Sequence, residues 1–309
     1  MNPATHELLS QRIRLLGNLP AMPSILSALS DELSIRASQI NVDRVVTTIS
    51  YDKSLTAQCL RLANSALFRQ RGDVATVREA VFALGLWRIR DLAFSCSLPL
   101  MFTNVCKAVR REVFWRHSLG TALIAQTLEQ RLCETHTNQA YLCGLLHDIG
   151  ILVNGVLFPE EFRDVLEEAV SEKVRIPAIE RRILGFTHEE SGKILAELWR
   201  LPIEVSEVVE YHHHRDSQPG KNDLTFLVSV ADEVCLKYGL GYGYEIEVDP
   251  VLALRELWDS LRARFPKAAD YSADDSQSVI ESAVASAISL ADHVFSPAST
   301  TTGETSQKG

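Results

Sequence analysis

The segment GLLHDIG, residues 144–150, places two ionisable side chains at the end of an apolar stretch. Its His147 and Asp148 follow the uncharged run Tyr141 to Leu146. An imidazole and a carboxylate are costly to bury in such a place unless something pairs with them. A divalent cation is one such partner, because imidazole and carboxylate ligands together suit Zn, Fe, Mn or Ni. The segment is therefore a candidate part of a metal site.

Further residues of ligand type lie on other segments of the chain, both before and after this one. Helical bundles build interior metal sites from side chains that project from facing helices. We predict that these residues and the two in GLLHDIG face one shared pocket, with His117 and His213 at its edge or inside it. We also predict that this pocket holds one or two divalent ions of Fe, Mn, Zn or Ni. The candidate metal ligands are His117, His147, Asp148, His188, His212, His213 and Asp232.

Taken singly, these residues have simpler interpretations. A lone histidine beside an apolar helix, such as His117 or His188, is more often a hydrogen-bonded core residue. The run His212 to His214 also fits an exposed polar helix end, and Asp232 alone fits a helix cap or the partner of an arginine. The ordered set favours a shared pocket. Whether a metal occupies that pocket stays open at this point.

The elements that must position these residues are helices. Apolar residues recur at helical spacing, for example in the stripe from Ile25 to Leu33. Thr76 with Glu79 and Thr187 with Glu190 have the spacing of helix capping boxes. No set of alternating strands with hairpin turns is present in the pattern. We therefore predict an all-α fold, a multi-helix bundle.

Proline and glycine punctuation predicts two helical parts and a tail. Short helices are expected in the first part, with breaks at 19–23, at 72–73 and at Pro99, and longer helices in the second. No Gly/Ser-rich linker separates the parts, so we expect one rigid unit. The segment 215–223 is predicted to be a polar loop. The predicted boundaries are 1–105 for an N-terminal helical subdomain, 106–295 for a second helical subdomain, and 296–309 for a disordered tail.

Composition excludes several classes of function. The net charge of -9 disfavours nucleic-acid binding, which depends on clustered Lys and Arg. No uninterrupted run of about 18 apolar residues occurs, so we expect no membrane span. The N-terminus lacks the apolar region of a signal peptide, and the six cysteines form no CxxC pair. A cytoplasmic location with reduced cysteines is the resulting expectation.

The order H…HD…H…HH…D resembles that of the HD superfamily of metal-dependent phosphohydrolases. Within it, the chain resembles the HDOD family, the HD-related output domains, over about residues 12–240, although Lys53 stands where that family usually has Pro. The segments that carry the resemblance are LPAMP (19–23), ISYDKSL (49–55), LRLANS (60–65), Val77 to Gly85, WRHS (115–118) and GLLHDIG (144–150).

The resemblance implies a purely helical HD-type fold with an N-terminal helical subdomain. It also implies a regulatory role in bacteria, as an output or scaffold that contacts signalling proteins, in processes linked to nucleotide second messengers. Enzymatic activity is not implied. HDOD domains commonly lose some metal ligands, whereas this sequence keeps a nearly complete set, and that departure favours metal binding.

A second departure argues against catalysis. Active phosphodiesterases of the HD-GYP kind usually carry Lys in HDIGK, where this chain has Ile151, which cannot contact a phosphate. Their GYP signature is absent, and we interpret Gly241 to Gly243 as a loop only. The cations of Arg181, Arg182, Lys193 or Arg215 are the candidates to substitute for that Lys. A metal-dependent phosphohydrolase or cyclic-nucleotide phosphodiesterase is the alternative function, and we expect its turnover to lie near background.

Two further features have structural interpretations. Asn64 and Ser65 are expected to end a helix and to join the two subdomains through side-chain hydrogen bonds. A cluster of five arginines is expected to form a solvated face rather than a partner-binding patch. This basic cluster comprises Arg88, Arg90, Arg110, Arg111 and Arg116.

Overall fold

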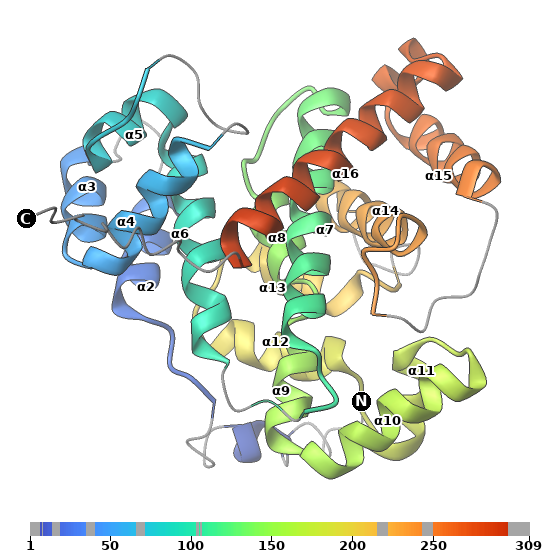
Figure 1. Cartoon of the computed structure of the whole chain (residues 1–309). Helices are drawn as coiled ribbons and strands as arrows, with labels where there is room; N and C mark the ends of the chain where they lie inside the picture. The colour runs from blue at the N-terminus through green and yellow to red at the C-terminus, as the bar shows by residue number, and fades with distance from the viewer. Residues whose placement is uncertain are drawn as a thin grey trace, which may run out of the picture.

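The computed structural model describes residues 7, 9–13, 19–34, 41–65, 72–102, 105, 107–214, 222–242 and 250–295. Within these residues the chain is helical and has no strand, so the all-α fold class is confirmed (Figure 1). The helices are α2 (Ser24–Ser34), α3 (Val42–Ser50), α4 (Lys53–Ala63), α5 (Val77–Leu84), α6 (Leu86–Met101), α7 (Arg111–Leu132), α8 (Ala140–Leu146), α9 (Ile149–Leu157), α10 (Pro159–Glu172), α11 (Ile176–Ile183), α12 (His188–Leu198), α13 (Ile203–Tyr211), α14 (Asp223–Lys237), α15 (Pro250–Arg264), the short 3₁₀ helix η2 (Pro266–Asp270) and α16 (Ala273–Phe295).

The predicted helix starts are confirmed at α5 and α12. The Thr76 side chain accepts a hydrogen bond from the Glu79 backbone N–H at the start of α5. Thr187 and Glu190 form a reciprocal capping box at the start of α12. Such caps satisfy backbone donors that have no partner within the helix. The second cap also fixes the position at which His188 begins its helix.

The predicted break at Pro99 is wrong. Helix α6 continues through Pro99 and ends at Met101. The proline lies two residues before the helix end, so the hydrogen bond that it removes belongs to the last turn, where a break disturbs little of the helix.

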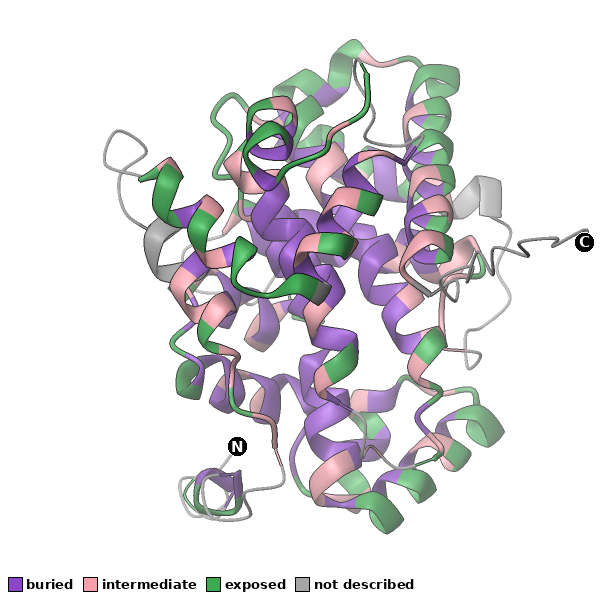
Figure 2. Ribbon diagram, turned by 60° about the vertical axis from the view of Figure 1, so that its left-hand side comes forward, coloured by how far each residue is buried: buried purple, intermediate pink, exposed green. Residues whose placement is uncertain are grey.

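Helix α7 is the centre of the molecule. It packs against α8, α14 and α16, and the three neighbours surround it in Figure 1. Side chains along its length are buried, and the buried colour follows the central helices in Figure 2. Helix α8 approaches closely because Gly144 has no side chain: a Cβ there would lie 2.7 Å from the Ala122 Cα. The GLLHDIG segment is thereby held directly against α7.

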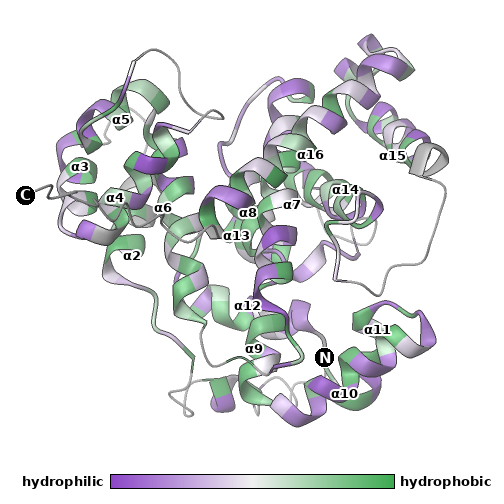
Figure 3. Cartoon of the chain, viewed as in Figure 1, coloured by the Kyte–Doolittle hydropathy of each residue, from purple (hydrophilic) through white to green (hydrophobic). Residues whose placement is uncertain are grey.

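The stretch Ala140–Leu157, which contains α8 and α9, is mostly apolar, with His147, Asp148 and Asn154 as its polar residues (Figure 3). Its mean hydropathy of 1.6 over 18 residues meets the length and composition expected of a membrane-spanning segment. However, 89% of the stretch is buried inside the protein, as in the core helices of many proteins. Its apolar character is accounted for by packing against the surrounding helices.

A buried arginine joins the two predicted subdomains. Arg90 in α6 donates to Asp91 beside it, with the closest contact at 2.6 Å, and also to the Asn138 carbonyl and the Gln139 side chain just before α8. Arg90 is only 2% exposed, so its assignment to a solvated face is wrong. A buried guanidinium needs partners for its donors, and these lie on both sides of the predicted boundary.

Asn64 ends α4 as predicted, but it does not join the subdomains. Its side chain bonds to the Leu60 carbonyl and to both backbone groups of Val74, and Ser65 bonds back to Leu62. These contacts pin the loop before α5 within the N-terminal part. The predicted loop at 215–223 lies mostly, and the tail at 296–309 wholly, outside the described residues.

Candidate metal centre

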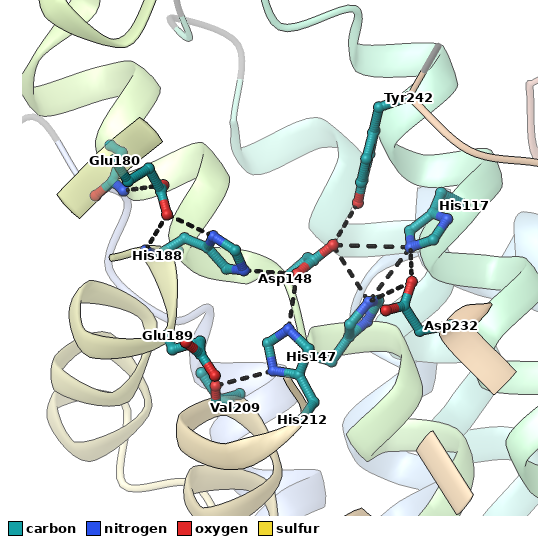
Figure 4. Close-up of polar contacts among 12 residues, drawn as sticks. His117, His147, Asp148, Glu180, His188, Glu189, Val209, His212, Asp232 and Tyr242 are labelled. Atoms are coloured by element: carbon teal, nitrogen blue, oxygen red, sulfur yellow. Dashed lines mark hydrogen bonds and ion pairs between the residues drawn. The ribbon is translucent and has the colours of Figure 1, made fainter. Parts of the chain in front are cut away.

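Helix ends bring the predicted ligands together (Figure 4). His147 follows the last residue of α8, Asp148 precedes α9, and His212 follows α13. His188 is the first residue of α12. His117 and Asp232 project from within α7 and α14. All six are at most 4% exposed, whereas His213 is partly exposed.

Gly150 allows two ligand-bearing segments to meet. A Cβ at this position would lie 1.9 Å from the His188 carbonyl oxygen and 2.8 Å from the Gly192 nitrogen. No side chain fits there, so the glycine lets α9 and α12 touch through their backbones. Asp148, two residues earlier, is thereby brought within reach of His188.

The four buried imidazoles are oriented alike. The Nδ1 atoms of His117, His147 and His212 lie 2.8–3.2 Å from backbone carbonyl oxygens. The Nδ1 atom of His188 lies 2.7 Å from a carboxylate oxygen of Glu180. Carbonyl oxygens only accept hydrogen bonds, so these Nδ1 atoms carry the proton in the neutral rings. The Nε2 lone pairs then point into the cluster.

Four donor atoms form a first group. The Nε2 atoms of His117 and His147 are 3.3 Å apart, and each lies 3.2 Å from one aspartate oxygen, of Asp232 and Asp148 respectively. The remaining histidine–aspartate distances are 3.7 and 4.0 Å. Donors bound to one ion at about 2.1 Å are separated by at most about 4.2 Å. The atoms of His117, His147 and Asp148 are therefore spaced to share one ion, and Asp232 lies beside them in contact with His117.

A second group lies on the other side of Asp148. Its Oδ1 atom is 3.1 Å from the Nε2 atoms of both His188 and His212. His213 contributes another nitrogen, and the ligand atoms of these four residues all lie within 4.8 Å of one another. The Oδ2 atom of Asp148 belongs to the first group, so one carboxylate connects the two groups. All seven predicted ligands are thus brought together, and the cluster could hold a metal.

Burial alone would lower the pKa values of His117 and His188, but the carboxylates of Asp232, Glu180 and Asp148 outweigh it and raise both, so the cluster favours cations. Burial alone would raise the pKa of Asp148, but the neighbouring histidines outweigh it and hold that pKa well below its ordinary value. Burial lowers the pKa of His213 well below its ordinary value, and its histidine neighbours add to the effect. Asp148 is therefore ionised and His213 neutral, which are the states in which they bind metals.

Sequence reasoning missed two residues of the site. Glu180 is fully buried; it accepts hydrogen bonds from the His188 ring and backbone, and its other oxygen accepts one from Asn154. Gly241 and Tyr242 lie outside the helices, as in the predicted loop, but Tyr242 also belongs to the site because it donates to Asp148 Oδ2 at 2.7 Å. A glutamate within the apolar spacing of α11 was the available signal for Glu180. No signal marked Tyr242, because its contact depends on how the chain returns after α14.

The cations considered as replacements for a phosphate-binding lysine lie elsewhere. Arg182 pairs with the exposed Glu168 and Glu172, Arg181 pairs with the partly buried Glu190, and Lys193 pairs with Glu210. Arg215 lies outside the described residues. Ile151 is buried and faces a cavity beside the cluster.

Comparison with known proteins identifies relatives of the whole fold. The HDOD domain family model matches residues 19–215, more than half of the chain. A protein of Treponema pallidum (strain Nichols) named as uncharacterised is 26% identical over 203 residues, which are 65% of this chain and 39% of that relative. The chain thus spans less than half the length of this relative.

Two solved structures resemble the fold over nearly its full length. An HDOD domain protein of unknown function from Geobacter sulfurreducens has a TM-score of 0.80 and 28% identity, covering 96% of this chain and 100% of that one. A proposed phosphohydrolase from Shewanella amazonensis SB2B has a TM-score of 0.73 and 21% identity, covering 92% and 97%. Asp232 and Tyr242 lie beyond the segment matched by the family model.

Proposed function

This chain belongs to the HDOD domain family, and from that premise we propose that it is a bacterial signalling protein of the cytoplasm that binds divalent metal in its buried cluster. It acts by contacting other signalling proteins. The ions, one or two of Fe, Mn, Zn or Ni, hold α7, α8, α9, α12, α13 and α14 in one arrangement. The predicted division at residue 105 separates an N-terminal part, α2 to α6, from the part that carries the ligands.

The observation that carries the metal proposal is the convergence of buried imidazole nitrogens and carboxylate oxygens. His117 and His147 face each other through Nε2 atoms 3.3 Å apart, while their Nδ1 atoms are committed to carbonyl oxygens. At that distance the two nitrogens need a proton or a metal cation between or beside them. The Nε2 atom of His188 is also buried, and it shares Asp148 Oδ1 with the Nε2 atom of His212, each at 3.1 Å. The donor set, imidazole with carboxylate, suits the four metals named.

If bound, the metal would supply Lewis acidity and an activated water, which is the chemistry of a phosphohydrolase. The connection of two donor groups through Asp148 favours this second candidate function, because two-ion sites are typical of phosphoester cleavage. The protein would then have to stabilise the charge that develops on phosphate. Ile151 offers no donor beside the cluster, and Arg181, Arg182 and Lys193 are paired with carboxylates elsewhere.

Signalling is therefore the better supported function, with hydrolysis weak or absent. The test is elemental analysis of the purified protein together with turnover assays on cyclic di-GMP and on nucleotides. We expect bound metal and turnover near background. Metal-dependent turnover of about 1 s⁻¹ or faster, in the usual enzyme range and abolished by His147→Ala, would replace this proposal with the hydrolase.

A protein that contains no metal after expression in medium supplied with all four ions, and binds none on titration, would refute the metal centre. Association with partners is tested separately by crosslinking in cells followed by identification of the captured proteins. Loss of that association in a variant whose exposed charged side chains on α2 to α6 are replaced by serine, with the buried Arg90 and Asp91 kept and metal content unchanged, would support a contact surface on the N-terminal part.

A further inference from the structure

A cavity of about 560 Å³ lies beside the metal cluster and takes no part in holding the proposed ions. Its walls come from the segment before α7, the first turn of α7, α9, α10, α11 and the chain after α14. The volume falls within the range of about 300–1,000 Å³ that small-molecule sites occupy. We propose that this cavity binds an amphipathic organic monoanion, a carboxylate with a hydrocarbon or aromatic body.

The walls are suited to an apolar body. Nine of the eleven lining side chains are aliphatic or aromatic, among them Phe114, Ile151 and Ile176. Val170, at the rim, is 53% exposed although its side chain is apolar. Apolar surface that is left in contact with water around a concave site gains free energy when a hydrocarbon covers it.

The charges around the cavity select one negative group. Among the described residues that line the cavity, Arg110 and Glu167 are the charged ones. Glu167 lies 3.8 Å from Arg163, which pairs more closely with Glu160 and Asp164, so Glu167 keeps its negative charge and the anion must bind on the side of Arg110. Arg110 precedes α7, whose N-terminus adds partial positive charge at the same place. One arginine and one helix end suffice for a single carboxylate, whereas a cyclic dinucleotide or a diphosphate would require more positive charge in these walls.

Tyr242 separates this cavity from the cluster. Its ring stacks with Phe114 at 6.1 Å between centroids and lies 4.5 Å from the His117 ring, while its hydroxyl donates to Asp148. The side chain therefore lines the cavity and contacts two proposed ligands at once. The proposed site is thus adjacent to the metal centre and distinct from it, and its ligand is held without a metal.

The test uses the full-length protein and the fluorescent anion 8-anilinonaphthalene-1-sulfonate as the probe. Octanoate, decanoate, decanol and decylamine compete for it, in protein treated with chelator and in untreated protein. We expect decanoate to displace the probe better than decylamine. Each further methylene that the cavity accepts should raise affinity about fourfold, because burying a methylene contributes about 0.8 kcal/mol.

Variants separate the two parts of the ligand. Arg110→Ala should weaken decanoate binding about fivefold and leave decanol unchanged, Arg110→Lys should retain most of the affinity, and Val113→Trp should abolish binding by filling the cavity. Arg78→Ala, which removes an exposed arginine on α5, is the matched control. If Val113→Trp does not fold, as judged by circular dichroism, the comparison of decanoate with decanol in Arg110→Ala decides.

Three results would overturn the inference: no displacement by decanoate, affinity that does not depend on chain length, or equal effects of Arg110→Ala and Arg78→Ala. Stronger displacement by cyclic di-GMP than by decanoate would also overturn it and assign the cavity to a polyanion. Since the measurement is made with and without chelator, its failure is independent of whether the cluster binds metal.

Discussion

Replacing Glu180 by glutamine tests whether the carboxylate behind His188 supports a metal ligand. The carboxylate accepts three hydrogen bonds at 2.7–2.8 Å, from the His188 backbone, the His188 ring and the Asn154 side-chain amide. Glutamine has nearly the same shape but only one accepting oxygen. If that oxygen faces His188, the new amide opposes the Asn154 donors, and in the other orientation it opposes the His188 donors.

The expected loss follows from these contacts. A carboxylate that accepts from the ring N–H of a ligating histidine orients the ring and increases its basicity, and removing such a partner typically lowers metal affinity about 10- to 100-fold. This corresponds to about 1.4–2.8 kcal/mol. The donor left unsatisfied in a buried position should also lower the free energy of unfolding by about 1–3 kcal/mol. The effect on metal binding should persist at temperatures where the variant is fully folded.

The assay is competition for Zn²⁺ or Mn²⁺ between the protein and a chromophoric chelator of known affinity. Glu190→Gln is the matched control, because Glu190 lies on the same turn as His188 but pairs with Arg181 and caps α12. We expect the control to bind metal as the unmodified protein does. Equal metal affinity in Glu180→Gln, in the control and in the unmodified protein would refute the role assigned to this carboxylate.

Asp148→Ala should sharply reduce the metal content measured by elemental analysis, because it removes a charge and a ligand common to both donor groups; unchanged stoichiometry would show that Asp148 binds no ion. Gly150→Ala should lower the free energy of unfolding by about 3 kcal/mol or more, since its Cβ would lie 1.9 Å from the His188 carbonyl oxygen; a change under about 1 kcal/mol in denaturant melts would contradict this. Arg90→Met should lower it by about 3–5 kcal/mol, because the carboxylate beside it stays buried without its partner, whereas the exposed pair removed by Arg78→Ala should account for less than about 1 kcal/mol. Equal losses in the free energy of unfolding for Arg90→Met and Arg78→Ala would mean that the buried pair does not join the two parts of the molecule.

Local patterns were sufficient for the fold class and for the choice of candidate ligands. Helical spacing of apolar residues and the caps at Thr76 and Thr187 depend on neighbours within a few positions, so they can be identified without coordinates. The candidate ligands could be selected because ionisable side chains are unusual within apolar helices. His147, Asp148 and Asp232 stand out in this way, and all three lie in the cluster.

Long-range packing decided the rest. Glu180 and Tyr242 were missed because their partners are 8 and 94 positions away, at His188 and Asp148, and no local pattern specifies such contacts. Arg90 was misassigned because an arginine in a helix normally reaches solvent, whereas here the chain before α8 closes over it. The direction in which the imidazoles point was likewise set by tertiary contacts, with backbone carbonyl oxygens for three of them and the Glu180 carboxylate for His188. The sequence by itself determined which residues could bind a metal, and the tertiary structure decided how they are oriented and what supports them, because hydrogen-bond partners and cavity walls exist only once distant segments have packed.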